Sequence, residues 1–151
     1  MDLVGVLSAS KGEVLAEAFA SLERSHLKHY ELAGPEGSRQ RLSDLFDLVL
    51  DCLGQRQLAP MVEYAETVAQ ERFSAGFDIS EVQTAFNVLE EAIWTVVVPR
   101  IPAEELAEAT GLIGTVLGAG KDSLARAWVS LATSRHVPSL DLSALFQGTG
   151  G

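Results

Sequence analysis

The spacing of apolar residues constrains the fold of this chain more than any other feature of its sequence. Apolar side chains recur at steps of three and four residues, as in Leu42, Leu45, Phe46, Val49 and Cys52. This spacing places them along one side of an α-helix, whereas a half-buried β-strand needs alternation with a period of two. No useful length of the chain alternates in that way. The sequence therefore predicts an all-α fold.

Capping residues, glycines and prolines divide this pattern into about five to six helices. Ser10 with Glu13, and Asp78 with Glu81, have the spacing of capping boxes, and Gly76 is placed to end a helix. We expect a loop over residues 31–37, and helices over residues 3–7, 11–30, 39–53, 61–75 and 102–133. A further helix follows the connection over residues 76–80 and ends near residue 98, with Ser80 as an alternative to Asp78 as its cap.

These elements predict one globin-like or helical-bundle domain over residues 1–135, with a long C-terminal helix. Pro138 breaks the helical pattern, and residues 136–151 are expected to form a C-terminal tail or linker. Leu142, Leu145 and Phe146 would share one side of a short helix in this tail. They are candidates for docking to a partner protein, and the alternative is a tail that folds back on its own domain or stays disordered.

Charge and cysteine content limit the partners and the cellular location. The chain has 11 basic residues, which are scattered, and a net charge of −10, so nucleic acids and anionic membranes are poor candidates. The N-terminus lacks the pattern of a signal peptide, and the apolar run before Pro99 is too short to span a bilayer. Cys52 is the only cysteine and is expected to be a buried thiol. We therefore expect a cytoplasmic protein.

No constellation of reactive side chains predicts an enzyme, a metal site or a bound cofactor. Glu23 and His26 form one Glu-x-x-His motif, whereas di-iron helical bundles use two such motifs with two further glutamates. A haem pocket needs a histidine ligand, and no histidine lies between Tyr30 and Arg135. Glu23 and His26, with His29 near them, are therefore the only metal candidates, and solvated side chains are the simpler interpretation.

Glycines in the predicted last helix need an explanation, because each is less favourable there than alanine by up to about 1 kcal/mol. They are Gly111, Gly114, Gly118 and Gly120. One explanation is close packing within the chain. The other is a symmetric dimer contact formed by Gly111, Gly114, Gly118 and Trp128.

Two further expectations concern aromatic and charged side chains. A cavity between helices could hold a small molecule or cofactor, with Phe46, Tyr64, Phe86 and Trp94 as its lining. Arg72, opposite Glu71 and Glu66, and Arg100 are expected to form surface ion pairs that add little stability.

The stretch from Val68 to Trp94, VAQERFSAGFDISEVQTAFNVLEEAIW, resembles the N-terminal sensory domain of RsbR-type stressosome proteins. The resemblance is carried by the end of one helix at Arg72 and Gly76, a short acidic turn, and a second helix. That helix contributes Val82, Ala85, Phe86, Leu89, Ile93 and Trp94. The similarity extends over roughly residues 3–131.

The resemblance implies an all-helical domain that dimerises and regulates a signalling protein without catalysis of its own. We therefore expect a sensory or regulatory module of bacterial stress signalling that acts through protein–protein contacts. One alternative is a small-molecule or cofactor sensor. A less favoured one is a metal-dependent helical-bundle enzyme that uses Glu23 and His26.

Overall fold

The structure is a computed structural model that describes residues 2–136 of the chain. These residues form seven α-helices and two short 3₁₀ helices, and no strand occurs among them, which confirms the all-α prediction. In chain order the helices are α1 (Leu3–Ala9), α2 (Lys11–Arg24), α3 (Lys28–Ala33), α4 (Pro35–Gln55), α5 (Ala59–Ser74), α6 (Ile79–Val97), η1 (Val98–Arg100), η2 (Ala103–Glu105) and α7 (Leu106–His136). None of them combines the length and hydropathy that crossing a bilayer requires.

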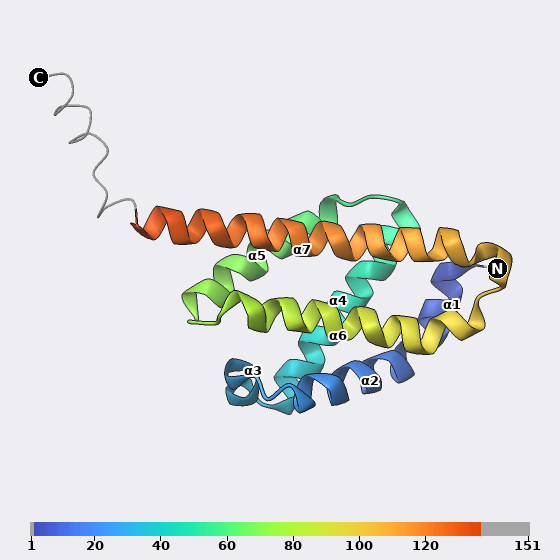
Figure 1. Cartoon of the computed structure of the whole chain (residues 1–151), viewed down its shortest axis with the longest axis horizontal. Helices are drawn as coiled ribbons and strands as arrows, with labels where there is room; N and C mark the ends of the chain where they lie inside the picture. The colour runs from blue at the N-terminus through green and yellow to red at the C-terminus, as the bar shows by residue number, and fades with distance from the viewer. Residues whose placement is uncertain (1, 137–151) are drawn as a thin grey trace, which may run out of the picture.

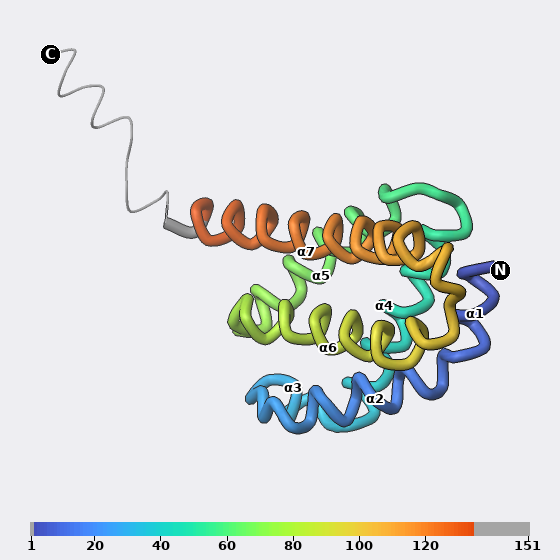
Figure 2. Tube along the Cα trace, turned by 45° about the vertical axis from the view of Figure 1, so that its right-hand side comes forward, coloured from blue at the N-terminus to red at the C-terminus, as the bar shows by residue number. Residues whose placement is uncertain are grey.

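The long helices lie side by side, and α4 crosses them. Figure 1 shows α7, α6 and α2 as three nearly parallel rods, and Figure 2 shows from a second angle that α6 lies between α7 and α2. Helix α5 packs along α7, and α2 packs along α6. Helix α4 contacts each of the other α-helices. It therefore holds the two sides of the domain together.

The core is built from the apolar stripes that the sequence predicts. Phe46 of α4 and Phe86 of α6 are among the largest fully buried side chains. Cys52 is a free thiol with 1% of its surface exposed, as expected. Burial raises the pKa of this thiol, which keeps it protonated and unreactive at neutral pH.

The predicted helix over residues 11–30 is wrong, because the chain turns at its middle. Helix α2 ends at Arg24, and α3 begins at Lys28. Between them His26 has left-handed backbone angles (φ 49°), a conformation that reverses the chain direction. The Ser25 hydroxyl also donates to the carbonyl of Ser21 at 2.9 Å and competes with continuation of the helix.

The predicted loop over residues 31–37 is also wrong. Helix α3 continues to Ala33, and α4 begins at Pro35, so one residue separates them. Gly34 makes this junction possible with a φ of 85°, which an L side chain rarely adopts. Pro35 then occupies the first turn of α4, where its missing N–H is harmless.

One predicted capping box forms, and the other does not. The Asp78–Glu81 box is present at the start of α6. At the start of α2, the Ser10 hydroxyl instead donates to the Val6 carbonyl at 2.8 Å. Arg100, just after α6, donates to Ser10 Oγ at 2.7 Å and to Glu13 at 2.6 Å. The hydrogen bonds from Arg100 to Ser10 and Glu13 therefore take the place of the predicted Ser10–Glu13 capping box.

The glycines of α7 divide into two groups. A Cβ atom at Gly120 would lie 2.8 Å from Met61 Sδ and 2.8 Å from a ring carbon of Phe86. At Gly111, Gly114 and Gly118, nothing lies within 4 Å of that position. Close packing within the chain therefore explains Gly120, and the other three glycines face open space.

Substitution of Gly120 by alanine is expected to destabilise the domain by about 1–3 kcal/mol, because the added methyl group overpacks Met61 and Phe86. Gly54→Ala is the matched control, since Gly54 is exposed near the end of α4 and has free space around it. That change should be neutral or stabilising. Urea unfolding followed by circular dichroism measures both. Equal stability of Gly120→Ala and the wild type would contradict the close packing.

Candidate functional site

Buried polar side chains gather at the end of the molecule where α3, α4, α5 and the start of α6 meet. Glu81 is one centre of this group, with only 8% of its surface exposed. Its Oε1 atom accepts hydrogen bonds from the Asp78 N–H at 3.0 Å and the His29 Nδ1–H at 2.7 Å. Its Oε2 atom accepts from the His29 N–H at 2.9 Å. The carboxylate thus joins the N-terminal ends of α3 and α6.

The hydrogen bonds of Glu81 decide its charge state. Burial alone would raise the pKa of this carboxyl group. The N–H groups of Asp78 and His29, together with the His29 ring, outweigh that effect and hold the pKa below its usual value. Glu81 is therefore ionised at neutral pH, and both of its carboxylate oxygens accept hydrogen bonds from His29 or Asp78.

The turn after α5 places an aromatic ring beside this carboxylate. Gly76 takes a φ of 86°, and the Phe77 N–H returns to the Arg72 carbonyl at 3.0 Å, so α5 ends as predicted. The Phe77 ring stacks on His29 with 4.8 Å between centroids. It also meets the edge of Tyr30 at 5.3 Å. Phe77 thereby connects the end of α5 to α3.

Two arginines from different helices approach the same ring. The guanidinium carbons of Arg41 from α4 and Arg72 from α5 each lie 5.6 Å from the Phe77 centroid. Arg41 also lies 5.5 Å from the Tyr30 centroid. Burial lowers the pKa of Arg41, and the positive charge of Arg72 lowers it further. Like charges therefore face each other in a partly buried site.

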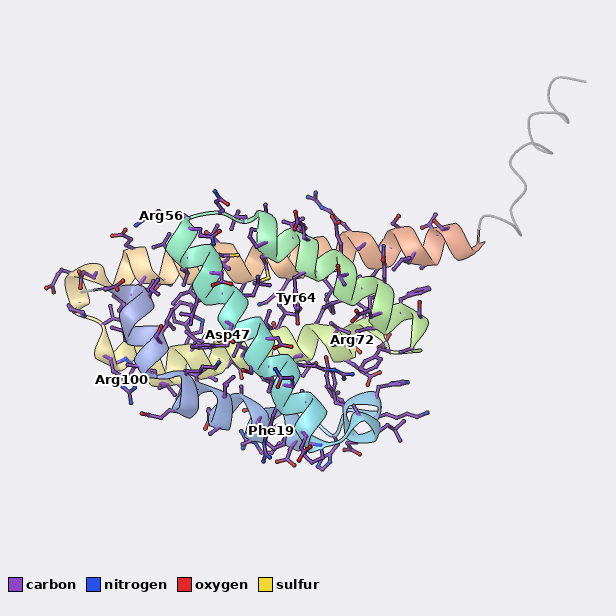
Figure 3. All side chains as sticks on the ribbon, turned by 180° about the vertical axis from the view of Figure 1, so that it is seen from behind. Phe19, Asp47, Arg56, Tyr64, Arg72 and Arg100 are labelled. Atoms are coloured by element: carbon purple, nitrogen blue, oxygen red, sulfur yellow. The ribbon has the colours of Figure 1, made fainter. Side chains whose placement is uncertain are left out.

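Two tyrosines complete the group, which we call the arginine–tyrosine cluster: Arg41, Arg72, Tyr30, Tyr64 and Phe77. Burial raises the pKa of Tyr64 to about 12. Burial also raises the pKa of Tyr30, although the nearby arginines oppose this shift. Both hydroxyls are therefore neutral at pH 7 and can donate hydrogen bonds. Figure 3 shows Tyr64 and Arg72 on the side of α5 that faces α4.

Two nitrogen atoms of the cluster have no acceptor. Arg41 Nη1 and Arg72 Nε are buried and make no hydrogen bond within the described residues. Arg72 does form an ion pair through a different nitrogen, Nη1, which lies 3.3 Å from Glu71 Oε2. Buried polar atoms are normally paired, so these two donors distinguish the cluster from ordinary core. The N–H groups of a guanidinium can donate hydrogen bonds to a bound acceptor. A charged guanidinium is not a nucleophile.

The expectation for Arg72 was half right. It does pair with Glu71, but only 11% of its side chain is exposed, so it is not a surface residue. Sequence reasoning missed Arg41, Tyr30 and Glu81 as members of a site. One signal in the sequence could have identified Arg41. It lies beside Leu42 and four residues before Leu45, so it shares the buried face of an amphipathic helix.

The aromatic residues predicted to line a cavity lie in different environments. Phe46 and Phe86 are fully buried in the core. Tyr64 belongs to the arginine–tyrosine cluster, and Trp94 is partly buried against the core. A pocket of about 490 Å³ lies elsewhere, between α1, the end of α4 and the start of α7, and is lined in part by Leu3, Arg56 and Leu112.

The Glu23–His26 motif does not form on one helical face. Helix α2 ends at Arg24, and His26 follows with left-handed backbone angles. Its Nδ1 atom lies 3.2 Å from Glu31 Oε1, and both side chains are exposed. Among residues 2–136, no group of three or more His, Cys, Asp or Glu side chains is placed to hold a metal ion.

The candidate dimer residues of α7 do not share one environment. Gly111 and Gly118 are exposed, and Gly114 is partly exposed. Trp128 is 9% exposed and packs edge-on against Phe73 of α5 within the same chain, with 5.5 Å between ring centroids. The tail candidates, Leu142, Leu145 and Phe146, lie outside the described residues.

Replacement of Glu81 by glutamine is expected to lower the free energy of unfolding at pH 7 by about 1–3 kcal/mol, because buried N–H donors lose a charged acceptor. Its pKa is lower in the folded state, so the stability due to ionisation is present at neutral pH and is lost as the pH falls through the folded pKa. The difference from the wild type should therefore shrink below about pH 4.

Urea unfolding at pH 7 and at acidic pH measures this effect. Glu91→Gln removes the same charge from an exposed position of α6 and should change stability by less than about 0.5 kcal/mol. A Glu81→Gln protein as stable as Glu91→Gln at pH 7 would show that the buried carboxylate does not hold α3 to α6.

Comparison with known proteins adds one finding to this geometry. One protein-family model, the N-terminal domain of the RsbT co-antagonist protein rsbRD, matches residues 12–130. No curated protein and no solved structure matches the chain. The match covers more than half of the chain, from the start of α2 into the last part of α7, and includes the whole arginine–tyrosine cluster. The chain therefore belongs to the family of RsbT co-antagonist rsbRD N-terminal domains, which have a regulatory role in stress signalling.

Proposed function

We propose that this protein is a non-enzymatic sensory module of a cytoplasmic stress-signalling system. It acts as a homodimer and regulates a partner protein by direct contact. The regulatory part of this proposal rests on the family match over residues 12–130. The proposed dimer rests on one observation. The outer face of α7, which is the face turned away from α5, carries three glycines with open space around them.

The outer face of α7 has the composition of a helix–helix contact. Helix α7 is 31 residues long, and its inner face packs along α5. On the outer face the space around Gly111, Gly114 and Gly118 is open. The distance between packed helix axes depends on the side chains at the contact, so glycines permit close approach. These residues would lie against the same residues of a second copy.

An exposed apolar side chain extends this face toward the C-terminal end of α7. Val129 is 63% exposed. It follows Gly118 by about three helical turns and therefore shares its face. Asp122 and Arg126 lie nearby and form an exposed ion pair at 3.1 Å. Asp122 lies one turn after Gly118 on the same face, so a second copy that covers Val129 would also meet this ion pair.

The position of Trp128 refines the proposed contact. Because Trp128 packs against Phe73 inside the chain, its role in a dimer would be to fix α7 on α5. The contact itself then consists of Gly111, Gly114, Gly118 and Val129. Leu142, Leu145 and Phe146, which lie outside the described residues, are proposed to dock to the partner protein.

Gly118→Arg is expected to convert the dimer to a monomer, because a long charged side chain would separate the two copies of α7. Gly12→Arg is the matched control, since Gly12 is an exposed glycine of α2 with free space around it. Figure 1 shows α2 on the opposite side of the molecule from α7. Size-exclusion chromatography with light scattering, at tens of micromolar by order of magnitude, measures the mass. A monomeric wild type, or a dimer unchanged by Gly118→Arg, would refute this interface.

A further inference from the structure

We propose that Arg41 and Arg72 form a binding site for a small oxyanion, a phosphate or a carboxylate, between α4 and α5. The site goes beyond the proposed dimer, because it lies in the arginine–tyrosine cluster and not on the outer face of α7. The ligand would accept hydrogen bonds from the two unpaired guanidinium nitrogens.

The unpaired donors are the first argument for this site. Arg41 Nη1 and Arg72 Nε are both buried and both lack an acceptor in the described part of the chain. A buried donor without an acceptor is unfavourable, and a bound ion or an ordered water would satisfy it. The two atoms come from neighbouring helices and from side chains that approach the same Phe77 ring. The proposed ligand would accept hydrogen bonds from both.

The charge balance of the cluster is the second argument. Arg41 forms no ion pair with any residue from 2 to 136. The carboxylate that pairs with Arg72 belongs to Glu71, whose side chain is 62% exposed. Glu81 is buried nearby, but its oxygens accept hydrogen bonds from His29 and Asp78. Among the described residues Arg41 therefore has no carboxylate partner of its own, in a chain whose net charge is −10.

The types of side chain present select the chemical class of the ligand. Guanidinium groups offer planar N–H donors that match the oxygens of carboxylates and phosphates, and they have no acceptor. The hydroxyls of Tyr30 and Tyr64 are protonated and can donate to further oxygens. A cation would be repelled by the two arginines. The site is also small, because most of the Arg72 side chain is buried.

Nuclear magnetic resonance of the full chain gives a direct test. Sodium phosphate, sodium succinate and sodium chloride are titrated separately at constant ionic strength, and the Nε–Hε signal of Arg72 is followed. This signal is assigned by its loss in Arg72→Lys. Phosphate or succinate should shift it in a saturable manner, and chloride should not. The stronger of the two identifies the oxyanion as a phosphate or a carboxylate. No shift with either anion, or the same shift with chloride, overturns the proposal.

Arg41→Gln and its control test the other half of the site. Calorimetric titration with the same anions should show at least about tenfold weaker binding to Arg41→Gln, because one charge-assisted hydrogen bond is lost. Arg39→Gln removes the same charge two positions away, from an exposed side chain that stacks on Phe19, and should bind as the wild type does. Equal weakening by both variants would indicate attraction by overall charge and would overturn the assignment.

The thermal stability of the variants shows whether loss of binding reflects loss of the fold. Without phosphate or carboxylate, Arg41→Gln should melt no lower than the wild type, because it removes a charge that repels Arg72. With saturating anion, the wild type and Arg39→Gln should gain the same stability, and Arg41→Gln should gain less. A large drop in melting temperature of Arg41→Gln without anion would mean that Arg41 is already satisfied within the chain, and the proposal would fail. The oligomeric state of Gly118→Arg is independent of these results.

Discussion

The whole domain depends on α4, which contacts each of the other α-helices. A helix in that position must bury apolar side chains over a broad face, and α4 does so from Leu42 to Leu53. Its register also fixes the polar residues beside that face. Ser38 and Leu45 are buried and lie about one turn on either side of Arg41, so Arg41 points inward with them. The partly buried arginine is thus a consequence of the crossing helix.

The two faces of α7 differ in their packing within the chain. Gly120 brings its inner face against Met61 and Phe86, where a side chain would not fit. The outer glycines meet no such neighbour, so packing within the chain does not require them. They still lower the helix propensity of α7. The long helix tolerates this loss because its inner face is held by α5 along much of its length.

Local signals in the sequence predicted those features that depend on neighbouring residues. The helical periodicity, the Asp78–Glu81 box and the end of α5 at Gly76 are all confirmed. The break at His26 was missed because a non-glycine residue with positive φ has no distinctive sequence signal. The arginine–tyrosine cluster was missed for a different reason, since α3, α4 and α5 contribute its side chains from distant parts of the chain. Tertiary packing brings them together, and no local spacing encodes it.

The position of α5 relates the proposed anion site to the proposed dimer. Arg72 on one side of α5 approaches α4, and Phe73 on another side packs against Trp128 of α7. An anion held by Arg41 and Arg72 would therefore tie α4 to the helix that supports the dimer face. Binding can change dimerisation only if the anion prefers one placement of α5 over another. A preference of about 1.4 kcal/mol changes the dimer affinity tenfold, and dimerisation must then change the anion affinity by the same factor.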